Sequence, residues 1–193
     1  MIIFAVILVI LLFLYHSEFN TQNFWIRGRK YAVHNNFHPS SSAQVLDEVN
    51  RRVLALQQHM KKKYLEAQQP YSRFDMRART EQFLENYSPD SLHEISPKNI
   101  FGSTSFTEGK GRKIVFCLRG VDGKLHDLNT IMFVALHEIT HVLNDRWGHE
   151  EYFWALFQII LADAAEIGIY APVDYRKKPA NYCGMQITQN PLI

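Results

Sequence analysis

Between about residues 129 and 144, apolar side chains recur at three- and four-residue steps, the pattern of a helix with one face in a core. The same stretch carries His137-Glu138-x-x-His141. Residues four positions apart lie one turn apart on one face of a helix, so His137 and His141 can present both imidazoles to a single ion. Two histidines beside a core could instead make only local hydrogen bonds. The helical setting favours the metal site.

Glu138, between the two histidines, can act as a base. It lies about 100 degrees around the helix from His137, on the side where the open position of a catalytic zinc holds a water. A carboxylate there can take a proton from the water and so produce the nucleophile for hydrolysis of a peptide bond. The motif therefore predicts Zn²⁺ as cofactor, His137 and His141 as ligands, and Glu138 as the catalytic base.

A catalytic zinc needs a third protein ligand. His149 follows Gly148, at which the chain can turn sharply back towards the first two histidines. We therefore predict His149 as the third ligand. Asp163 or Glu166, on the following predicted helix, would serve if a carboxylate completed the site, whereas the first helix would point Asp145 away from the ion.

Further roles around the site follow from the same chemistry. A transition state that develops a negatively charged oxygen needs a hydrogen-bond donor, and Tyr182 and His126 are the candidates, each with a structural role as the alternative. The second ring N–H of a ligand histidine usually donates a hydrogen bond to a carboxylate or carbonyl group. Four carboxylates are candidates for this role, each with a solvated helix face as the alternative: Glu150, Glu151, Asp163 and Glu166. Three aromatic residues are predicted to be core: Phe153, Trp154 and Phe157.

The remaining patterns predict one compact α+β domain. An amphipathic helix is expected from about Val45 to Tyr64, with Ser41 and Gln44 as a capping box and an end near Pro70. Strands are expected at residues 112–120 and 182–187, and a helix that backs the metal helix at about residues 149–167. The active-site helix and the backing helix should therefore pack on a small β-sheet.

Residues 1–15 contain no charged side chain. This length is short of the roughly 20 residues that span a bilayer, but interfacial aromatic residues can assist a shorter segment. We predict an N-terminal transmembrane helix or membrane anchor at residues 1–17, a tether at residues 18–40 and the main domain at residues 41–193; a buried core segment is the alternative. The positive charges that follow the segment predict a single-pass protein with its C-terminal domain on the cytoplasmic side.

Composition narrows the function classes. An apolar fraction of 47%, a charged fraction of 21% and a net charge of +2 indicate a globular protein for which no specific nucleic-acid partner is expected. The chain has two cysteines, Cys117 and Cys183, and no Cys-x-x-Cys pair. Because Cys117 lies in an apolar strand pattern, we predict that it is a reduced core thiol, which agrees with the cytoplasmic side.

Three stretches of the sequence, "SLHEISPKNIFGSTSFTEGKGRKIVFCLRG", "FVALHEITH" and "GHEEYFW", resemble the WLM (Wss-like metalloprotease) family, kin to the SprT-like zinc metallopeptidases. The resemblance covers about residues 45–170 and is nearest to WLM-like proteins of large DNA viruses. It implies a compact zincin-like domain, with His137, His141 and His149 on zinc, Glu138 as base, and an extended substrate beside a strand edge. The family places its third histidine closer to the second than His149 lies to His141.

The leading hypothesis from the sequence is a membrane-anchored zinc metallopeptidase that acts on a protein or peptide substrate through a zinc-bound water activated by Glu138. The rival is a structural minor capsid protein on a peptidase fold, which would link a virion inner membrane, through residues 1–15, to viral capsid proteins. An intact Glu138 favours the peptidase, because a structural site needs no base.

Overall fold

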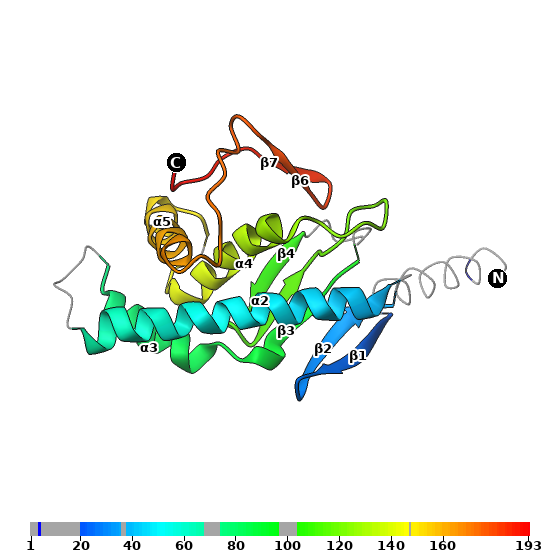
Figure 1. The fold of residues 1–193 in the computed structure, drawn as a ribbon, viewed down its shortest axis with the longest axis horizontal. Helices are drawn as coiled ribbons and strands as arrows, with labels where there is room; N and C mark the ends of the chain where they lie inside the picture. The colour runs from blue at the N-terminus through cyan, green and yellow to red at the C-terminus, as the bar shows by residue number, and fades with distance from the viewer. Residues whose placement is uncertain (1–3, 5–19, 36–37, 68–73, 97–103, 147) are drawn as a thin grey trace.

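The computed structural model describes residues 4, 20–35, 38–67, 74–96, 104–146 and 148–193 of the chain. They form an α+β domain with a five-stranded sheet, helices packed on it, and a separate two-stranded sheet. Figure 1 shows the long helix α2 (Pro39–Met60) crossing the sheet, with the hairpin β6–β7 (Ala180–Tyr182 and Met185–Ile187) on the other side of α4 (Leu128–Leu143). The predicted α+β class is confirmed.

The main sheet has the strand order β1-β2-β3-β5-β4. Its strands are β1 (Thr21–Ile26), β2 (Arg29–His34), β3 (Leu92–Glu94), β4 (Ser105–Glu108) and β5 (Lys113–Phe116). The β2–β3 and β3–β5 pairs are parallel, and the two outer pairs are antiparallel. Strand β4, which contacts α4, therefore lies at one edge of the described sheet.

Helix α2 supplies one side of the core. Its fully buried apolar residues recur at helical spacing: Leu46, Val49, Val53, Leu56 and Met60. The helix begins at Pro39, where a missing N–H costs nothing, and no side chain caps it, so the predicted Ser41–Gln44 capping box does not form. The helix continues as a π-helix, η1 (Lys61–Glu66), before α3 (Met76–Asn86) and the 3₁₀ turn η2 (Pro89–Ser91). The predicted end near Pro70 falls on undescribed residues.

Residues 18–40, predicted as a tether, contain the β1–β2 hairpin of the main sheet. In β2, Tyr31 and Val33 are fully buried against the core. The hydroxyl of Tyr31 donates to Asp47 on α2 at 3.0 Å and accepts from the Asn50 amide at 2.9 Å. Asn23 and Lys30, two of the polar residues that suggested a tether, are exposed, because successive strand residues point to opposite faces.

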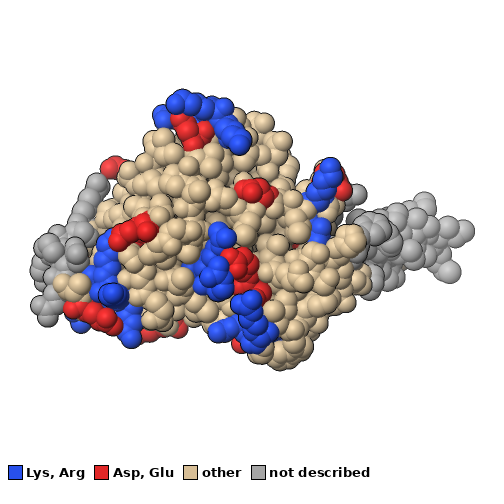
Figure 2. All heavy atoms as spheres, viewed as in Figure 1, with Lys and Arg blue, Asp and Glu red and all other residues tan. Residues whose placement is uncertain are grey.

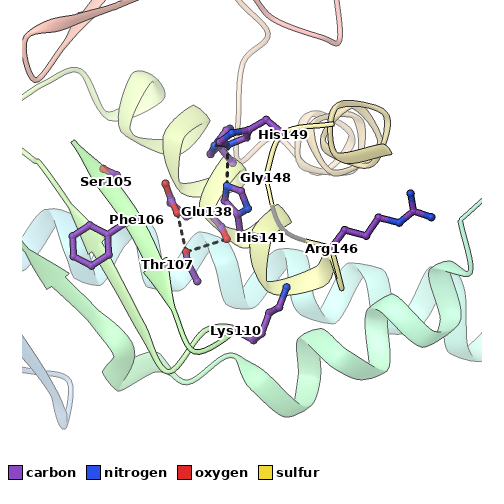
Figure 3. Close-up of a pocket in the computed structure, with 10 residues that line it drawn as sticks. Ser105, Phe106, Thr107, Lys110, Glu138, His141, Arg146, Gly148 and His149 are labelled. Atoms are coloured by element: carbon purple, nitrogen blue, oxygen red, sulfur yellow. Dashed lines mark hydrogen bonds between the residues drawn. The ribbon is translucent and has the colours of Figure 1, made fainter. Parts of the chain in front are cut away.

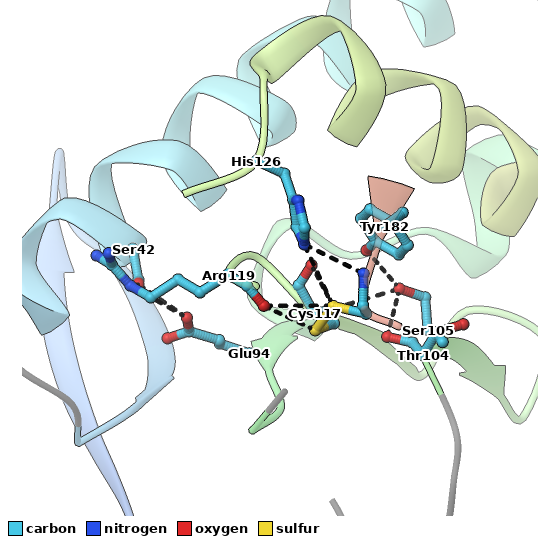
Figure 4. The surroundings of a disulfide bond; sticks show 9 residues. Ser42, Glu94, Thr104, Ser105, Cys117, Arg119, His126 and Tyr182 are labelled. Atoms are coloured by element: carbon cyan, nitrogen blue, oxygen red, sulfur yellow. Dashed lines mark hydrogen bonds and ion pairs between the residues drawn. A yellow bond between two sulfur atoms is a disulfide. The ribbon is translucent and has the colours of Figure 1, made fainter. Parts of the chain in front are cut away.

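A buried carboxylate joins the sheet to α2. Glu94 on β3 accepts a hydrogen bond from the Ser42 hydroxyl at 2.8 Å and one from the backbone N–H of His34 at 3.0 Å. Arg119 donates to Ser42 at 3.2 Å and lies 4.0 Å from Glu94 (Figure 4). Burial raises the pKa of Glu94, and these donors oppose that rise.

The two predicted central helices are confirmed, with small differences at their ends. Helix α4 is capped by Asp127, whose side chain accepts a hydrogen bond from the backbone N–H of Thr130 at 3.0 Å. Helix α5 (Glu151–Glu166) packs against it. Phe153 and Phe157 of α5 are buried as predicted.

The predicted strand at residues 182–187 is a hairpin. Cys183 and Gly184 have φ angles of 48° and 81°, and positive φ at both central residues suits the tight turn of a two-residue loop. Cys183 is joined to Cys117, at the end of β5, by a disulfide with a Cα–Cα distance of 6.2 Å. The prediction of a reduced core thiol at Cys117 is therefore wrong, although the residue is buried.

Among the described residues, no helix is both long enough and apolar enough to cross a membrane. This finding overturns the predicted transmembrane helix and the single-pass membrane localisation with a cytoplasmic domain. Of the predicted anchor at residues 1–17, the structure describes Phe4, and the rest lies outside the described residues. The charge-free run on which the prediction depended is itself shorter than the roughly 20 residues a bilayer requires.

Candidate metal centre

Three histidine rings meet at the C-terminal half of α4. The Nε2 atom of His149 lies 3.0 Å from Nε2 of His141 and 2.9 Å from Nε2 of His137. Helix α4 places the first two one turn apart, as their spacing predicts. Gly148, with a φ of 85°, lets the loop after α4 bring His149 back onto them. All three residues predicted as ligands are therefore together.

The donor set fits a dication. One imidazole Nε2 either carries a proton or offers a lone pair, so Nε2 of His149 cannot donate to one neighbour and accept from the other. Three ring nitrogens that lie this close to one another instead suit a zinc ion, whose nitrogen ligands at about 2.0–2.1 Å in tetrahedral geometry lie roughly 3.3 Å apart.

The protonation state of the rings agrees with this use. Burial, together with the neighbouring rings, lowers the pKa of His137 to about 3, and burial with His149 and Lys110 nearby lowers that of His141 to about 4. Burial also lowers the pKa of His149. The rings are thus neutral near pH 7, the form that coordinates a metal.

Glu138 lies beside the three rings and is 4% exposed. The hydroxyl of Thr107 on β4 lies 2.8 Å from its Oε2 and 3.3 Å from its carbonyl oxygen (Figure 3). Burial raises the pKa of Glu138 to about 7, and the Thr107 hydrogen bond opposes the rise. Such a carboxyl can both accept and return a proton near neutral pH.

The loop between α4 and α5 is held by side chains from elsewhere in the chain. Arg79 on α3 donates to the carbonyl oxygen of Leu143 at 3.0 Å and pairs with Asp145 at 2.8 Å. Lys110 donates to the carbonyl oxygen of Asn144. Asp145 is thus directed to Arg79 and away from the histidines, as the helix geometry predicts.

The alternative third ligands lie elsewhere. Lys63 contacts Asp163 at 2.7 Å and Glu166 at 2.6 Å, and Tyr64 donates to Asp163 at 2.9 Å. These two carboxylates therefore belong to a cluster with η1, together with His59, whose Nε2 lies 3.8 Å from Asp163. Of the three residues considered as third ligand, His149 is the one that lies beside His137 and His141.

The two predicted oxyanion donors occupy the region of the disulfide. Tyr182 is 1% exposed, and its hydroxyl lies 2.7 Å from the hydroxyl of Ser105 on β4. The ring of His126 packs on Tyr182 with a centroid distance of 4.9 Å, and its Nε2 accepts from the backbone N–H of Cys183 at 3.3 Å (Figure 4). Both residues thus contact the β6–β7 hairpin, and Tyr182 also lines a cavity together with His137 and Glu138, so the oxyanion role stays a prediction.

Two cavities meet at the histidines. The histidine cavity, of about 300 Å³, has ten lining residues: Ser105, Phe106, Thr107, Lys110, His137, Glu138, His141, Arg146, Gly148 and His149 (Figure 3). The apolar cavity, of about 460 Å³, shares Ser105, His137, Glu138 and His149 with it and extends under the β6–β7 hairpin. The site is therefore an open cleft with two arms.

Two residues of this cleft were missed by sequence reasoning. Trp154, predicted to be core, is 43% exposed and lines the apolar cavity. Thr107 lies 31 positions before Glu138, and only the placement of β4 beside α4 brings them together. The edge-strand pairing of β4 with β5 was the missing information.

Charges on the surface are mixed. On the face shown in Figure 2, groups of Lys and Arg lie beside Asp and Glu across the described part of the molecule. The expectation of no specific nucleic-acid partner stays a prediction.

Comparison with known proteins gives viral relatives. The chain is 32% identical over 171 residues, covering 86% of the chain and 81% of the relative, to the uncharacterized protein R325 of Acanthamoeba polyphaga mimivirus. It is 34% identical over 114 residues to the uncharacterized protein 042R of Invertebrate iridescent virus 3, covering 51% of the chain and 69% of the relative. Over 85 residues it is 38% identical to the uncharacterized protein 136R of Invertebrate iridescent virus 6, covering 42% of the chain and 46% of the relative.

No family model and no solved structure matches the chain. The resemblance to the WLM family therefore stays a prediction. The identity and coverage shared with the mimivirus protein show that this chain belongs to the same family as protein R325.

Proposed function

We propose that the protein is a zinc-dependent metallopeptidase of the WLM-like kind, with His137, His141 and His149 as ligands and Glu138 as base. One observation carries the proposal: the Nε2 atoms of His137 and His141 lie 2.9 Å and 3.0 Å from Nε2 of His149, and a buried carboxylate lines the same cavity. A site that only stabilised the fold would need no such carboxylate.

The proposed chemistry divides between the ion and the chain. A zinc ion held by the three rings would supply Lewis-acid polarisation of a peptide carbonyl and lower the pKa of a water. Glu138 would take the proton of that water on its carboxylate and return it to the departing amine. Thr107, through its hydrogen bond to Oε2, would fix the direction of the carboxylate.

The substrate would lie along β4. Among the described strands, β4 is at the sheet edge and contacts the helix that carries the histidines. An extended peptide can add to such an edge through backbone hydrogen bonds. Antiparallel pairing is the more stable arrangement, and it would hold the peptide across the cleft.

The test combines metal analysis with activity. We expect the purified full chain to hold about one zinc per molecule, as a three-histidine catalytic site does, and to cleave unfolded protein substrates. Glu138→Gln should keep the zinc and lose cleavage, because the amide cannot accept a proton. Glu81→Gln, on the exposed face of α3, is the matched control. Absence of zinc from the native chain, or full activity of Glu138→Gln, would overturn the proposal.

The capsid alternative stays a prediction that no observation in the described residues favours. It required the N-terminal segment to hold a membrane, and the described structure does not supply a spanning helix.

A further inference from the structure

The apolar cavity differs in chemistry from the histidine cavity that it joins. Its walls include Phe133 and Val134 from α4, Trp154 from α5, and Met185 and Ile187 from β7. Among its described lining residues there is no Lys, Arg or Asp, and Glu138, at the junction with the histidines, is the one acidic residue. The cavity therefore offers a large uncharged surface next to the proposed reaction centre.

We propose that this cavity is a specificity pocket that takes one large apolar side chain, aliphatic or aromatic, of a bound peptide. The proposal rests on the proposed peptidase function for the identity of the ligand as a peptide. The direction of β4 places this apolar side chain on the peptide residue directly after the cleaved bond.

Exposure of apolar side chains supports this occupant. Trp154 is 43% exposed and Met185 is 49% exposed, although most large apolar residues of the domain are buried. They lie on two elements, α5 and β7, that both line the cavity. Contact with an apolar side chain would remove their surface from water, which is favourable in proportion to the area covered. A charged side chain would instead have to leave water for walls that are mostly uncharged, which is unfavourable.

The pocket is formed before any ligand arrives. The β6–β7 hairpin that forms its outer wall is fixed by the disulfide at Cys183 and by the buried hydroxyl pair of Tyr182 and Ser105 (Figure 4). A wall held in this way loses little conformational freedom on binding, and preformed apolar pockets select ligands by fit.

The direction of the peptide follows from the two ends of β4. Thr104 and Ser105, at its beginning, line the apolar cavity, whereas Lys110, beyond its end, lines the histidine cavity. A peptide antiparallel to β4 would enter at the Lys110 end and leave at the Ser105 end. The residues after the cleaved bond would therefore reach the apolar cavity.

Binding of defined peptides tests the pocket without depending on cleavage. The probes are acetyl-Gly-Gly-Ser-X-Gly-Gly-amide peptides with X as Phe, Leu, Ala, Asp or Lys, and the protein is the full Glu138→Gln chain purified with zinc. Competition with a fluorescent peptide gives each dissociation constant. We expect Phe and Leu to bind about tenfold more tightly than Ala, a difference of about 1.4 kcal/mol, and Asp and Lys to bind less tightly than Ala, because each would have to take a charge out of water.

A pair of variants with equal charge change locates the effect. Met185→Asp should remove the preference for Phe and Leu, whereas Val121→Asp, at a residue 68% exposed and outside this cavity, should keep it. Equal affinities for all five peptides, or a preference that survives Met185→Asp, would overturn the pocket. So would a dimer of the native chain that dissociates on Met185→Asp, because a second copy would then cover the cavity.

Cleavage by the wild-type chain separates the two proposals. Mass spectrometry of the products should place an apolar residue directly after the cut, and a charged residue there would overturn the pocket assignment. Selective binding by Glu138→Gln without any cleavage by the wild-type chain would uphold the pocket and overturn the peptidase. Cleavage with no preference for an apolar residue after the cut would uphold the peptidase and overturn the pocket.

Discussion

The hydroxyl oxygen of Thr107 on β4 lies 2.8 Å from Oε2 of Glu138 on α4. This contact joins the sheet edge, where the substrate is proposed to lie, to the helix that carries the proposed base. Because Glu138 is 4% exposed, a lost partner cannot easily be replaced by bulk water.

Removal of this hydrogen bond should impair catalysis. Thr107→Val keeps the shape of the side chain and removes the donor, and loss of a buried hydrogen bond to a charged group costs about 1–3 kcal/mol. We expect kcat on a peptide substrate to fall about 5- to 100-fold. Thr107→Ser, which keeps the hydroxyl, should retain most activity. A Thr107→Val enzyme with unchanged kcat would contradict the role.

Zinc should stabilise the native chain through His149. An ion that binds only the folded state at about 100 times its dissociation constant adds about 2.7 kcal/mol, which is roughly 5–10 °C in the melting temperature of a domain this size. Calorimetry with zinc and with a chelator measures the difference.

The zinc effect has a matched control. His149→Ala should abolish the shift and lower the zinc content, because two imidazoles remain. His93→Ala, on β3 and outside the histidine cluster, should show the full shift. An equal shift in both variants would mean that zinc binds elsewhere.

The disulfide should contribute strongly to stability. Cys117 and Cys183 are 66 residues apart, and closing a loop of this length removes about 4 kcal/mol of unfolded-state entropy on the chain-entropy estimate. Denaturant unfolding of the native chain with and without a reductant measures the loss. The double variant Cys117→Ala/Cys183→Ser should be insensitive to the reductant. Two free thiols in the native chain under non-reducing conditions would refute the bond.

Glu48 should make stability depend on pH in the acid range. Hydrogen bonds from Arg51 and Arg52 outweigh burial and lower the pKa of Glu48 to about 2 from its ordinary value of 4.5. Its contribution is therefore fully present above pH 4.5 and is lost as the pH falls from 4.5 towards 2. Arg52 also donates to the carbonyl oxygen of Ile169 at 2.9 Å, so the pair links α2 to the end of α5.

The measurement compares wild type with Glu48→Gln in urea at pH 7 and at pH 2.5. The variant should be about 1 kcal/mol less stable at pH 7, as for a partly exposed ion pair, and the gap should shrink at pH 2.5. Glu81→Gln, at an exposed pair with Arg77, should show a smaller difference at both values. A gap that is constant with pH would show that the effect is not ionic.

The centre of the site could be predicted because it is local. A helical repeat fixes the relation of His137 to His141, and a glycine before His149 permits the return of the chain. Contacts across the sheet were out of reach. Thr107 meets Glu138 only because β4 pairs with β5 in the register that places it opposite Ile114.

The errors have physical causes as well. Cys117 lies in an apolar strand, where a thiol and a half-cystine leave the same pattern, and its partner is 66 positions away. Residues 21–34 have many polar side chains because one face of the β1–β2 hairpin faces outward. Trp154 has the spacing of a core residue, but the cleft opens beside it.

The short strand β3 bears on how the chain folds. It forms the middle of the sheet, between β2 and β5. Strand β2, which pairs with it through Ala32 and His93, precedes α2 and α3 in the sequence, whereas β5 comes after β3. Parallel pairing of β2 with β3 requires the long segment between them to be closed into a loop, and this closure costs conformational entropy before the pairing contacts form. In stopped-flow refolding with the disulfide intact, we expect helical circular dichroism to return before pulse-labelled hydrogen exchange shows protection of the backbone amides of β2 and β3, so the sheet centre sets the rate at which the native state is reached.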